Sequence, residues 1–160
     1  MPVHVQVFGL VRDEESDAPV VVLRAVEGQE TLLVQVGLAE AGAIASVMDK
    51  TPFPRPMTHD LLASVLDGLG GTLEKVEVTD LREGTFFGLL HVRKGRSVVQ
   101  IDCRPSDAIA LALKVDAPIF VADDVFTKAE PRDVREASRR NWLGFLDALE
   151  SEDDDGELVQ

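Results

Sequence analysis

The run from Ile101 to Leu113 reads IDCRPSDAIALAL and joins a polar turn to an almost wholly apolar helix. Arg104 and Pro105 end an alternating strand, and Ser106 is predicted to be the N-cap of the helix that follows. Asp107 falls in the first turn, where the helix dipole favours a carboxylate. The remainder of the run leaves no polar face, and a helix that is apolar all round is normally buried on every side. A turn on such a helix is held rigidly, so its polar side chains are candidates for a site.

A second Arg-Pro pair, Arg55 and Pro56, occurs in the stretch RPMTHDLL. It stands just before Thr58, which is predicted to cap another helix, and His59 and Asp60 take the first helical positions. Two such turns in one small chain suggest that they contribute to a shared site.

Alternating and helical hydropathy patterns divide the chain into short elements. The expected strands are Val3–Phe8, Val20–Val26, Thr31–Val36, Thr72–Val78, Thr85–Val92, Ser97–Cys103 and Pro118–Val121. The expected helices are Leu38–Asp49, His59–Leu69, the buried helix after Ser106, and a C-terminal helix from Pro131. This order predicts an α+β fold, with a largely antiparallel sheet, three packed helices and a C-terminal amphipathic helix.

Helical spacing predicts which side of the second helix faces the core. Its apolar residues recur at i, i+3 and i+4, which is typical of a core-facing stripe. The stripe comprises Leu61, Leu62, Val65, Leu66 and Leu69.

Length and composition indicate one globular unit. The chain has 160 residues, of which 45% are hydrophobic, and this is enough for one sizeable core. We expect a domain over residues 1–128, the C-terminal helix over 129–150 and an acidic disordered tail over 151–160. The apolar half of the C-terminal helix needs a surface to cover it, on its own domain or on a partner subunit.

Charge and cysteine content limit the functional classes. The formal net charge is -13, which argues against tight nonspecific binding of nucleic acid unless a local basic patch or a bound cation reverses it. Cys103 is the only cysteine, so no disulfide forms within the chain. No apolar run reaches the roughly 18 to 20 residues of a membrane helix. Without a signal-peptide pattern at the N-terminus, we expect a cytoplasmic protein with no membrane partner.

Five motifs, in this order, resemble the bifunctional nuclease domain family. They are EAGAIA at 40–45, RPMTHDLL at 55–62, the strands around GTFFGLL, IDCRPSDAIALAL, and APIFVADDV at 117–125. Two positions differ from the family pattern, because Cys103 and Gly88 stand where alanine is usual. The resemblance implies a compact α+β domain, found in bacteria and plants, that associates into dimers or larger assemblies. It also implies hydrolysis of phosphodiester bonds in DNA and RNA, the activity for which the plant members are named.

Phosphodiester hydrolysis requires an activated water and positive charge at the transition state, and the chain has candidates for both. His59 is the candidate general base or acid, and Arg55 and Arg104 are candidates to bind phosphate oxygens, with Asp107 beside them.

Three carboxylates are candidates to hold Mg²⁺ or Mn²⁺, namely Asp60, Asp102 and Asp107. Asp102 ends a strand and Asp107 starts a helix, a spacing that would let both point into one pocket. Neither the motifs nor the resemblance requires an organic cofactor.

Each candidate also has a structural role available. Arg104 can pair with Asp107, Asp102 or a carbonyl group as a clip, and His59 and Asp60 can serve the start of their helix. Glu40 lies on a helix rich in alanine, so close helix packing explains its motif equally well.

Two functional classes therefore stay open, a metal-dependent nuclease and a non-catalytic oligomeric interaction or regulatory module. A homo-oligomer is predicted in either case, because the C-terminal helix and the alanine-rich helix offer apolar surface.

Overall fold

The computed structural model describes residues 1–14 and 16–129, and in this part the chain forms seven strands and four helices. The strands are β1 (Val3–Arg12), β2 (Pro19–Ala25), β3 (Thr31–Gln35), β4 (Gly71–Arg82), β5 (Thr85–Lys94), β6 (Ser97–Cys103) and β7 (Ile119–Val121). The helices are α1 (Leu38–Met48), α2 (Thr58–Gly68), α3 (Pro105–Val115) and α4 (Asp123–Lys128). The predicted C-terminal helix and acidic tail lie outside the described residues, so the proposed division of the chain stays a prediction.

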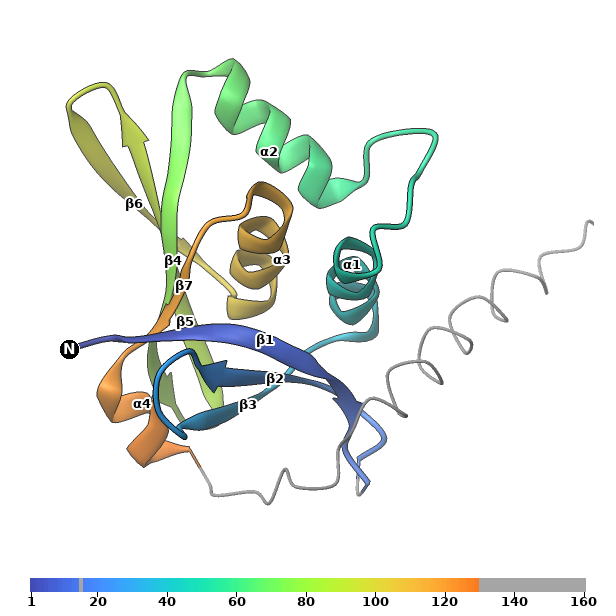
Figure 1. The fold of residues 1–160 in the computed structure, drawn as a ribbon, viewed down its shortest axis with the longest axis vertical. Helices are drawn as coiled ribbons and strands as arrows, with labels where there is room; N and C mark the ends of the chain where they lie inside the picture. The colour runs from blue at the N-terminus through green and yellow to red at the C-terminus, as the bar shows by residue number, and fades with distance from the viewer. Residues whose placement is uncertain (15, 130–160) are drawn as a thin grey trace, which may run out of the picture.

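The strands form one sheet in the order β3-β2-β1-β7-β4-β5-β6. Neighbouring strands are antiparallel except β4 and β7, which are parallel. Helices α1, α2 and α3 lie together beside the sheet, and the short α4 follows β7 at the opposite end of the molecule from α2 (Figure 1). The predicted α+β class and largely antiparallel sheet are confirmed, and α4 is an additional helix.

Helix α3 forms the centre of the core, as its composition predicts. Residues Ala108 to Ala112 are at most 1% exposed. The helix contacts α1 and α2 on one side and strands β4 and β5 on the other. The polar turn that precedes α3 is therefore anchored to the most buried element of the fold.

The predicted N-cap lies one residue too late in α2 and two residues too late in α3. Arg104, not Ser106, is the N-cap of α3, because Pro105 takes the first helical position. Proline suits that position because its missing N–H would have no helical partner and its φ angle is already helical. In α2, Met57 is the N-cap and Thr58 is the first helical residue.

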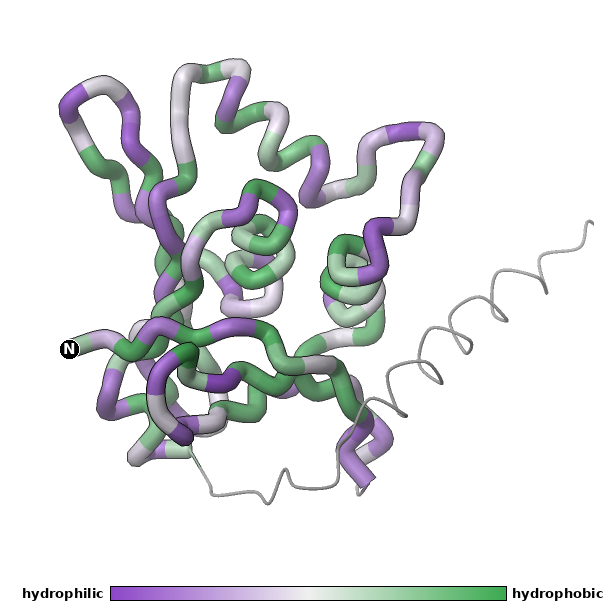
Figure 2. The backbone as a smooth tube through the Cα atoms, in the orientation of Figure 1, coloured by the Kyte–Doolittle hydropathy of each residue, from purple (hydrophilic) through white to green (hydrophobic). Residues whose placement is uncertain are grey.

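The core-facing stripe predicted for α2 is also wrong. Leu61 is 57% exposed and Leu69 is 69% exposed, and no residue of the helix is fully buried. Only Ala63 and Leu66 pack against the main core, so α2 rests on α3 by a narrow edge. Figure 2 shows the resulting mixture, with hydrophobic segments in α2 as well as in the buried α3.

Across residues 1–14 and 16–129, no helix has the length and apolar character needed to cross a membrane.

Candidate nuclease site

Three helices begin close together, and residues at their starts form one connected series of polar contacts. His59 of α2 and Asp107 of α3 interact through Nε2 and Oδ1 at 3.0 Å. Arg104 donates from Nε to the other oxygen of Asp107 at 3.0 Å, and from one terminal nitrogen to Glu40 Oε1 of α1 at 2.8 Å. Arg104 and Asp107 therefore close the clip that the sequence suggested, and His59 and Glu40 extend it across the helix layer.

The partner of His59 determines which ring nitrogen carries the hydrogen. An ionised carboxylate only accepts hydrogen bonds, so Nε2 of His59 must be the donor to Asp107. In the neutral ring Nδ1 then keeps its lone pair. Within the described residues Nδ1 makes no hydrogen bond, and it is not fully buried. The His59 side chain is 12% exposed, so an unpaired ring nitrogen belongs to a side chain that is held in place.

Arg104 is the solvent-exposed cation in this series of contacts. Hydrogen bonds with Asp107, and secondarily with Glu40, raise the pKa of the guanidinium further above its usual range. The side chain remains 65% exposed, and an arginine has five N–H donors, so some are left to bind an anion.

A second group lies on the neighbouring side of α2. Asp60 accepts a hydrogen bond from the N–H of Met57 at 2.9 Å and forms an ion pair with Lys114 of α3. Lys114, followed by the Met57 N–H, lowers the pKa of Asp60. Arg55 and Phe53 line an open cavity of about 460 Å³ with these side chains. Arg55 is thus grouped with Asp60 and Lys114, and no contact joins it to His59 or Arg104.

Asp102 belongs to neither group. It pairs in the sheet with Leu89, whereas the next residue, Cys103, packs against the core under the helices. Successive strand residues point to opposite faces of a sheet, so Asp102 lies on the face away from α2 and α3.

The three carboxylates proposed as metal ligands therefore do not form one ligand set. Within residues 1–14 and 16–129, no three His, Cys, Asp or Glu side chains are close enough together to hold a metal ion. Asp60 is engaged by Lys114, and both oxygens of Asp107 are engaged by His59 and Arg104.

Cys103 and Gly88 are the two departures from the family pattern, and they face each other across β5 and β6. A Cβ at position 88 would lie 3.1 Å from the Cys103 carbonyl oxygen and 3.4 Å from Sγ. The closest approach is thus to the backbone of residue 103, and the sulfur lies at ordinary van der Waals distance. Burial, with the charges of Asp102 and Asp107, raises the pKa of the Cys103 thiol to about 11, so this thiol is a packing group and not a nucleophile.

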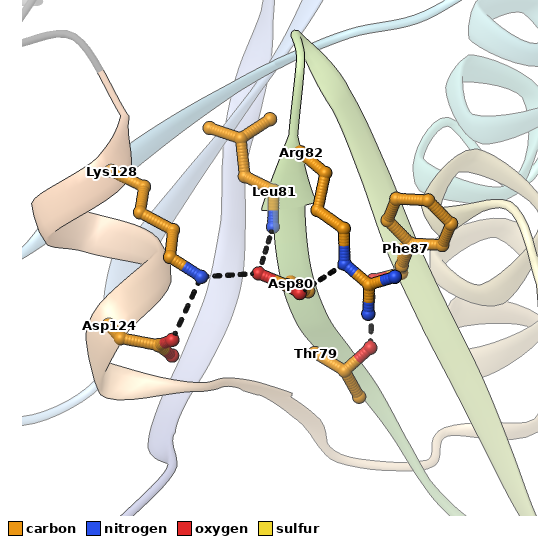
Figure 3. Close-up of polar contacts among 7 residues, drawn as sticks. All are labelled: Thr79, Asp80, Leu81, Arg82, Phe87, Asp124 and Lys128. Atoms are coloured by element: carbon orange, nitrogen blue, oxygen red, sulfur yellow. Dashed lines mark hydrogen bonds and ion pairs between the residues drawn. The ribbon is translucent and has the colours of Figure 1, made fainter.

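Helix α4 is held to the sheet by a separate group of charges (Figure 3). Asp80 accepts hydrogen bonds from Lys128 and from Arg82, each at 2.6 Å, and from the Leu81 N–H at 2.8 Å. Lys128 also pairs with Asp124, its neighbour one helical turn earlier, at 3.1 Å. Lys128 and Arg82 hold the pKa of Asp80 well below its ordinary value.

A match to the bifunctional nuclease domain covers residues 21–133 and includes every residue of the candidate site. The chain belongs to the bifunctional nuclease domain family. An uncharacterized protein of Mycobacterium tuberculosis is 34% identical over 94% of this chain and 96% of its own length.

Plant members of the family are more distant and longer. Bifunctional nuclease 2 of rice is 25% identical over 85% of this chain but only 43% of its own length. Bifunctional nuclease 1 of Arabidopsis thaliana is 28% identical over 64% of this chain and 33% of its own length. This chain thus spans less than half of the plant proteins whose names state a nuclease activity.

Sequence reasoning missed two members of the site. Glu40 stands in a family motif that helix packing explains equally well, so the sequence did not indicate that it pairs with Arg104. Lys114 carried no sequence signal beyond its place in the last turn of α3, and it is the partner of Asp60.

Proposed function

We propose that this chain hydrolyses phosphodiester bonds in DNA or RNA at the cluster of His59, Asp107 and Arg104. The observation that supports the proposal is the contact between His59 and Asp107. As in Ser-His-Asp hydrolases, a carboxylate fixes the tautomer of the histidine, although here it contacts Nε2 and leaves Nδ1 as the base. The family membership supplies the reaction class.

In the proposed reaction, Nδ1 of His59 removes a proton from a water molecule as the water oxygen attacks phosphorus. The bond between phosphorus and the leaving sugar oxygen breaks, and that oxygen takes a proton from solvent. General base catalysis of this kind contributes roughly 10²- to 10⁴-fold to a rate. Asp107 stabilises the imidazolium that forms.

Arg104 is the proposed ligand of the phosphate oxygens, because it and His59 contact the two oxygens of the same carboxylate and its side chain is 65% exposed. The charge on the transition state is larger than that on the substrate, so a fixed cation stabilises the transition state more. Arg55 and Lys114 are proposed to bind a flanking phosphate at the neighbouring cavity. No step is assigned to a metal ion, because the candidate carboxylates do not form one ligand set.

The test is cleavage of end-labelled DNA and RNA oligonucleotides by the purified protein, with EDTA and, in parallel, with Mg²⁺ or Mn²⁺. We expect His59→Gln and Arg104→Met to lower the rate by at least about 100-fold. Arg96→Met is the matched control, because it removes an arginine from the turn between β5 and β6. Cleavage that persists in His59→Gln would refute the assignment, and no cleavage under any condition would favour the non-catalytic module.

A homo-oligomer is a second proposal, and the exposed face of α2 supports it. Large apolar side chains are exposed there and on the adjoining edge strand β6, where Val99 and Ile101 pair with the buried Val92 and Leu90. An apolar surface that spans a helix and a free sheet edge is typical of a subunit interface.

Light scattering on the wild type and on Leu61→Lys tests this proposal. We expect a dimer or larger assembly for the wild type and a shift towards the monomer for the variant. A wild-type monomer at micromolar concentration would overturn it.

A further inference from the structure

The face of the sheet turned away from α1, α2 and α3 carries aromatic rings paired with cations. On β1, His4 and Gln6 alternate with the buried Val5 and so lie on this outer face. Phe8 lies in the bulge between Val7 and Gly9, and its contact with Arg24, an exposed residue between buried neighbours on β2, places it on the same face. Phe120 of β7 pairs with His4, and their rings stack with centroids 5.1 Å apart and an interplanar angle of 26°.

Two basic side chains lie over these rings. The Nζ atom of Lys75 is 5.4 Å from the centroid of Phe120, and the guanidinium carbon of Arg24 is 5.0 Å from the centroid of Phe8. Lys75 comes from β4 and Arg24 from β2, so the two pairs extend over four neighbouring strands, β2, β1, β7 and β4.

These two cations differ from the other basic residues of the same face. Arg82 also lies over a ring, that of Phe87, but Asp80 holds it in an ion pair. Among residues 1–14 and 16–129, no carboxylate pairs with Lys75 or Arg24.

One carboxylate, Glu77, lies in the same area. It pairs with Phe120 in the sheet, is 15% exposed and lies 3.4 Å from His91 Nε2. Aromatic and basic side chains thus gather beside a partly buried carboxylate, although the chain as a whole is acidic.

We propose that this outer face binds single-stranded nucleic acid, with bases stacking on Phe8 and Phe120 and phosphates paired with Arg24 and Lys75. The inference rests on the proposed function, since it names the form of the substrate and a second place where it is held. Bases stack on exposed rings of a sheet without need for a defined sequence, and nearby cations follow the backbone.

The location gives the binding a defined role. His59 lies in the helix layer on the other side of the sheet, so a strand on the outer face is not at the point of cleavage. The outer face therefore holds one segment of a long nucleic acid while another segment of the same molecule reaches the site. Loss of binding at this face should raise KM for long substrates and leave kcat unchanged.

Fluorescence anisotropy of labelled oligothymidylate of 15 nucleotides, at several salt concentrations, measures the binding directly. We expect Phe8→Ala and Phe120→Ala each to weaken binding by about 5- to 150-fold, the range for loss of one base stack. We expect Lys75→Met and Arg24→Met each to lower the slope of log K against log salt by about 0.7, the value for one single-strand phosphate. Phe8 is 51% exposed, so its replacement is not expected to disturb folding.

A control variant alters another part of the surface. Lys94→Met removes a charge from the end of β5. It should bind as the wild type does.

The outcomes separate this inference from the proposed function. Binding that depends on Phe8 and Phe120, without any cleavage, overturns the nuclease and leaves the binding face. No binding, or binding that Phe8→Ala and Phe120→Ala leave unchanged, overturns the binding face whatever the cleavage assay gives. Loss of an oligomer in Phe8→Ala without nucleic-acid binding identifies the face as a subunit contact and also overturns it.

Discussion

Replacing Asp107 by asparagine would reverse the tautomer of His59 while changing the shape of the site very little. Arg104 always donates, so the amide oxygen of an asparagine at this position should turn towards the guanidinium. Its NH₂ group then faces Nε2 of His59, which must become an acceptor and leave the hydrogen on Nδ1. In that tautomer the outward nitrogen can no longer take a proton from water.

The expected size of the effect follows from the two contacts at Asp107. In Ser-His-Asp hydrolases the corresponding Asp→Asn change lowers the rate by about 10⁴-fold, and we expect a loss of about 10²- to 10⁴-fold here. The cost in stability should be smaller. His59 is 12% exposed but Arg104 is 65% exposed, so solvent screens part of the charge, and we expect about 1–2 kcal/mol. For a chain of this size that is a fall in Tm of roughly 2–8 °C.

Glu40→Gln is the matched control. It removes a carboxylate from the same guanidinium, at 2.8 Å, without a contact to His59. We expect it to retain most of the activity, and the ¹⁵N chemical shifts of the His59 ring should change only in Asp107→Asn. Equal loss of activity in the two variants would show that the position of Arg104 matters and not the tautomer. Unchanged activity in Asp107→Asn would refute the catalytic assignment of His59.

Three further predictions concern the surroundings of the site. At pH 8 the thiol of Cys103, with its pKa raised to about 11, should react with iodoacetamide at least about tenfold more slowly than a free cysteine, and reaction at the ordinary rate would contradict its burial. Gly88→Ala should destabilise the chain by about 1 kcal/mol, because its Cβ meets the backbone carbonyl of residue 103, and the loss should persist when Cys103 is also alanine; a double-mutant cycle in urea checks this, and a loss that Cys103→Ala abolishes would contradict it. Because the pKa of Asp80 is lowered, the stability that it gives to α4 should be fully present above pH 3.8 and lost as the pH falls further; protection of α4 in hydrogen exchange that Asp80→Asn leaves unchanged would refute this.

The elements that could be predicted from the sequence are those whose pattern depends on burial alone. The apolar run of α3 can only be a buried helix, and the alternating strands around it can only pair antiparallel over turns of two or three residues. The parallel contact between β4 and β7 could not be predicted, because β7 has three residues and reaches its place by a crossover through α3.

The error in α2 has a physical reason. A stripe of leucines and a valine at helical spacing indicates that this side of the helix is buried against something. It does not indicate whether the partner is the core or another subunit. In the described chain only Ala63 and Leu66 of α2 pack against the main core, and the other members of the stripe are exposed, namely Leu61, Leu62, Val65 and Leu69. The same periodicity is produced by a core and by a subunit interface, so the pattern cannot distinguish them.

The sequence predicted that His59, Arg104 and Asp107 belong together, but it predicted neither their pairing nor the contacts of Glu40 and Lys114. Arg104 has Asp102 two residues before it and Asp107 three residues after it as possible partners, and strand alternation places Asp102 on the other face of the sheet. The pairing of Arg104 with Glu40 joins residues 64 positions apart and depends on how α1 packs against α3, which no local pattern contains.

The capping error at α3 bears directly on the chemistry. Had Ser106 been the N-cap, its side chain would have been the polar group at the start of the helix. With Pro105 in the first helical position, the helix starts earlier, Ser106 is only 7% exposed, and Arg104 becomes the last extended residue. An arginine at that point can reach both Asp107 within its own turn and Glu40 across the layer. The proline therefore positions the Arg104 guanidinium between Asp107 and Glu40. Asp107, held by Arg104, in turn fixes the position of the His59 ring.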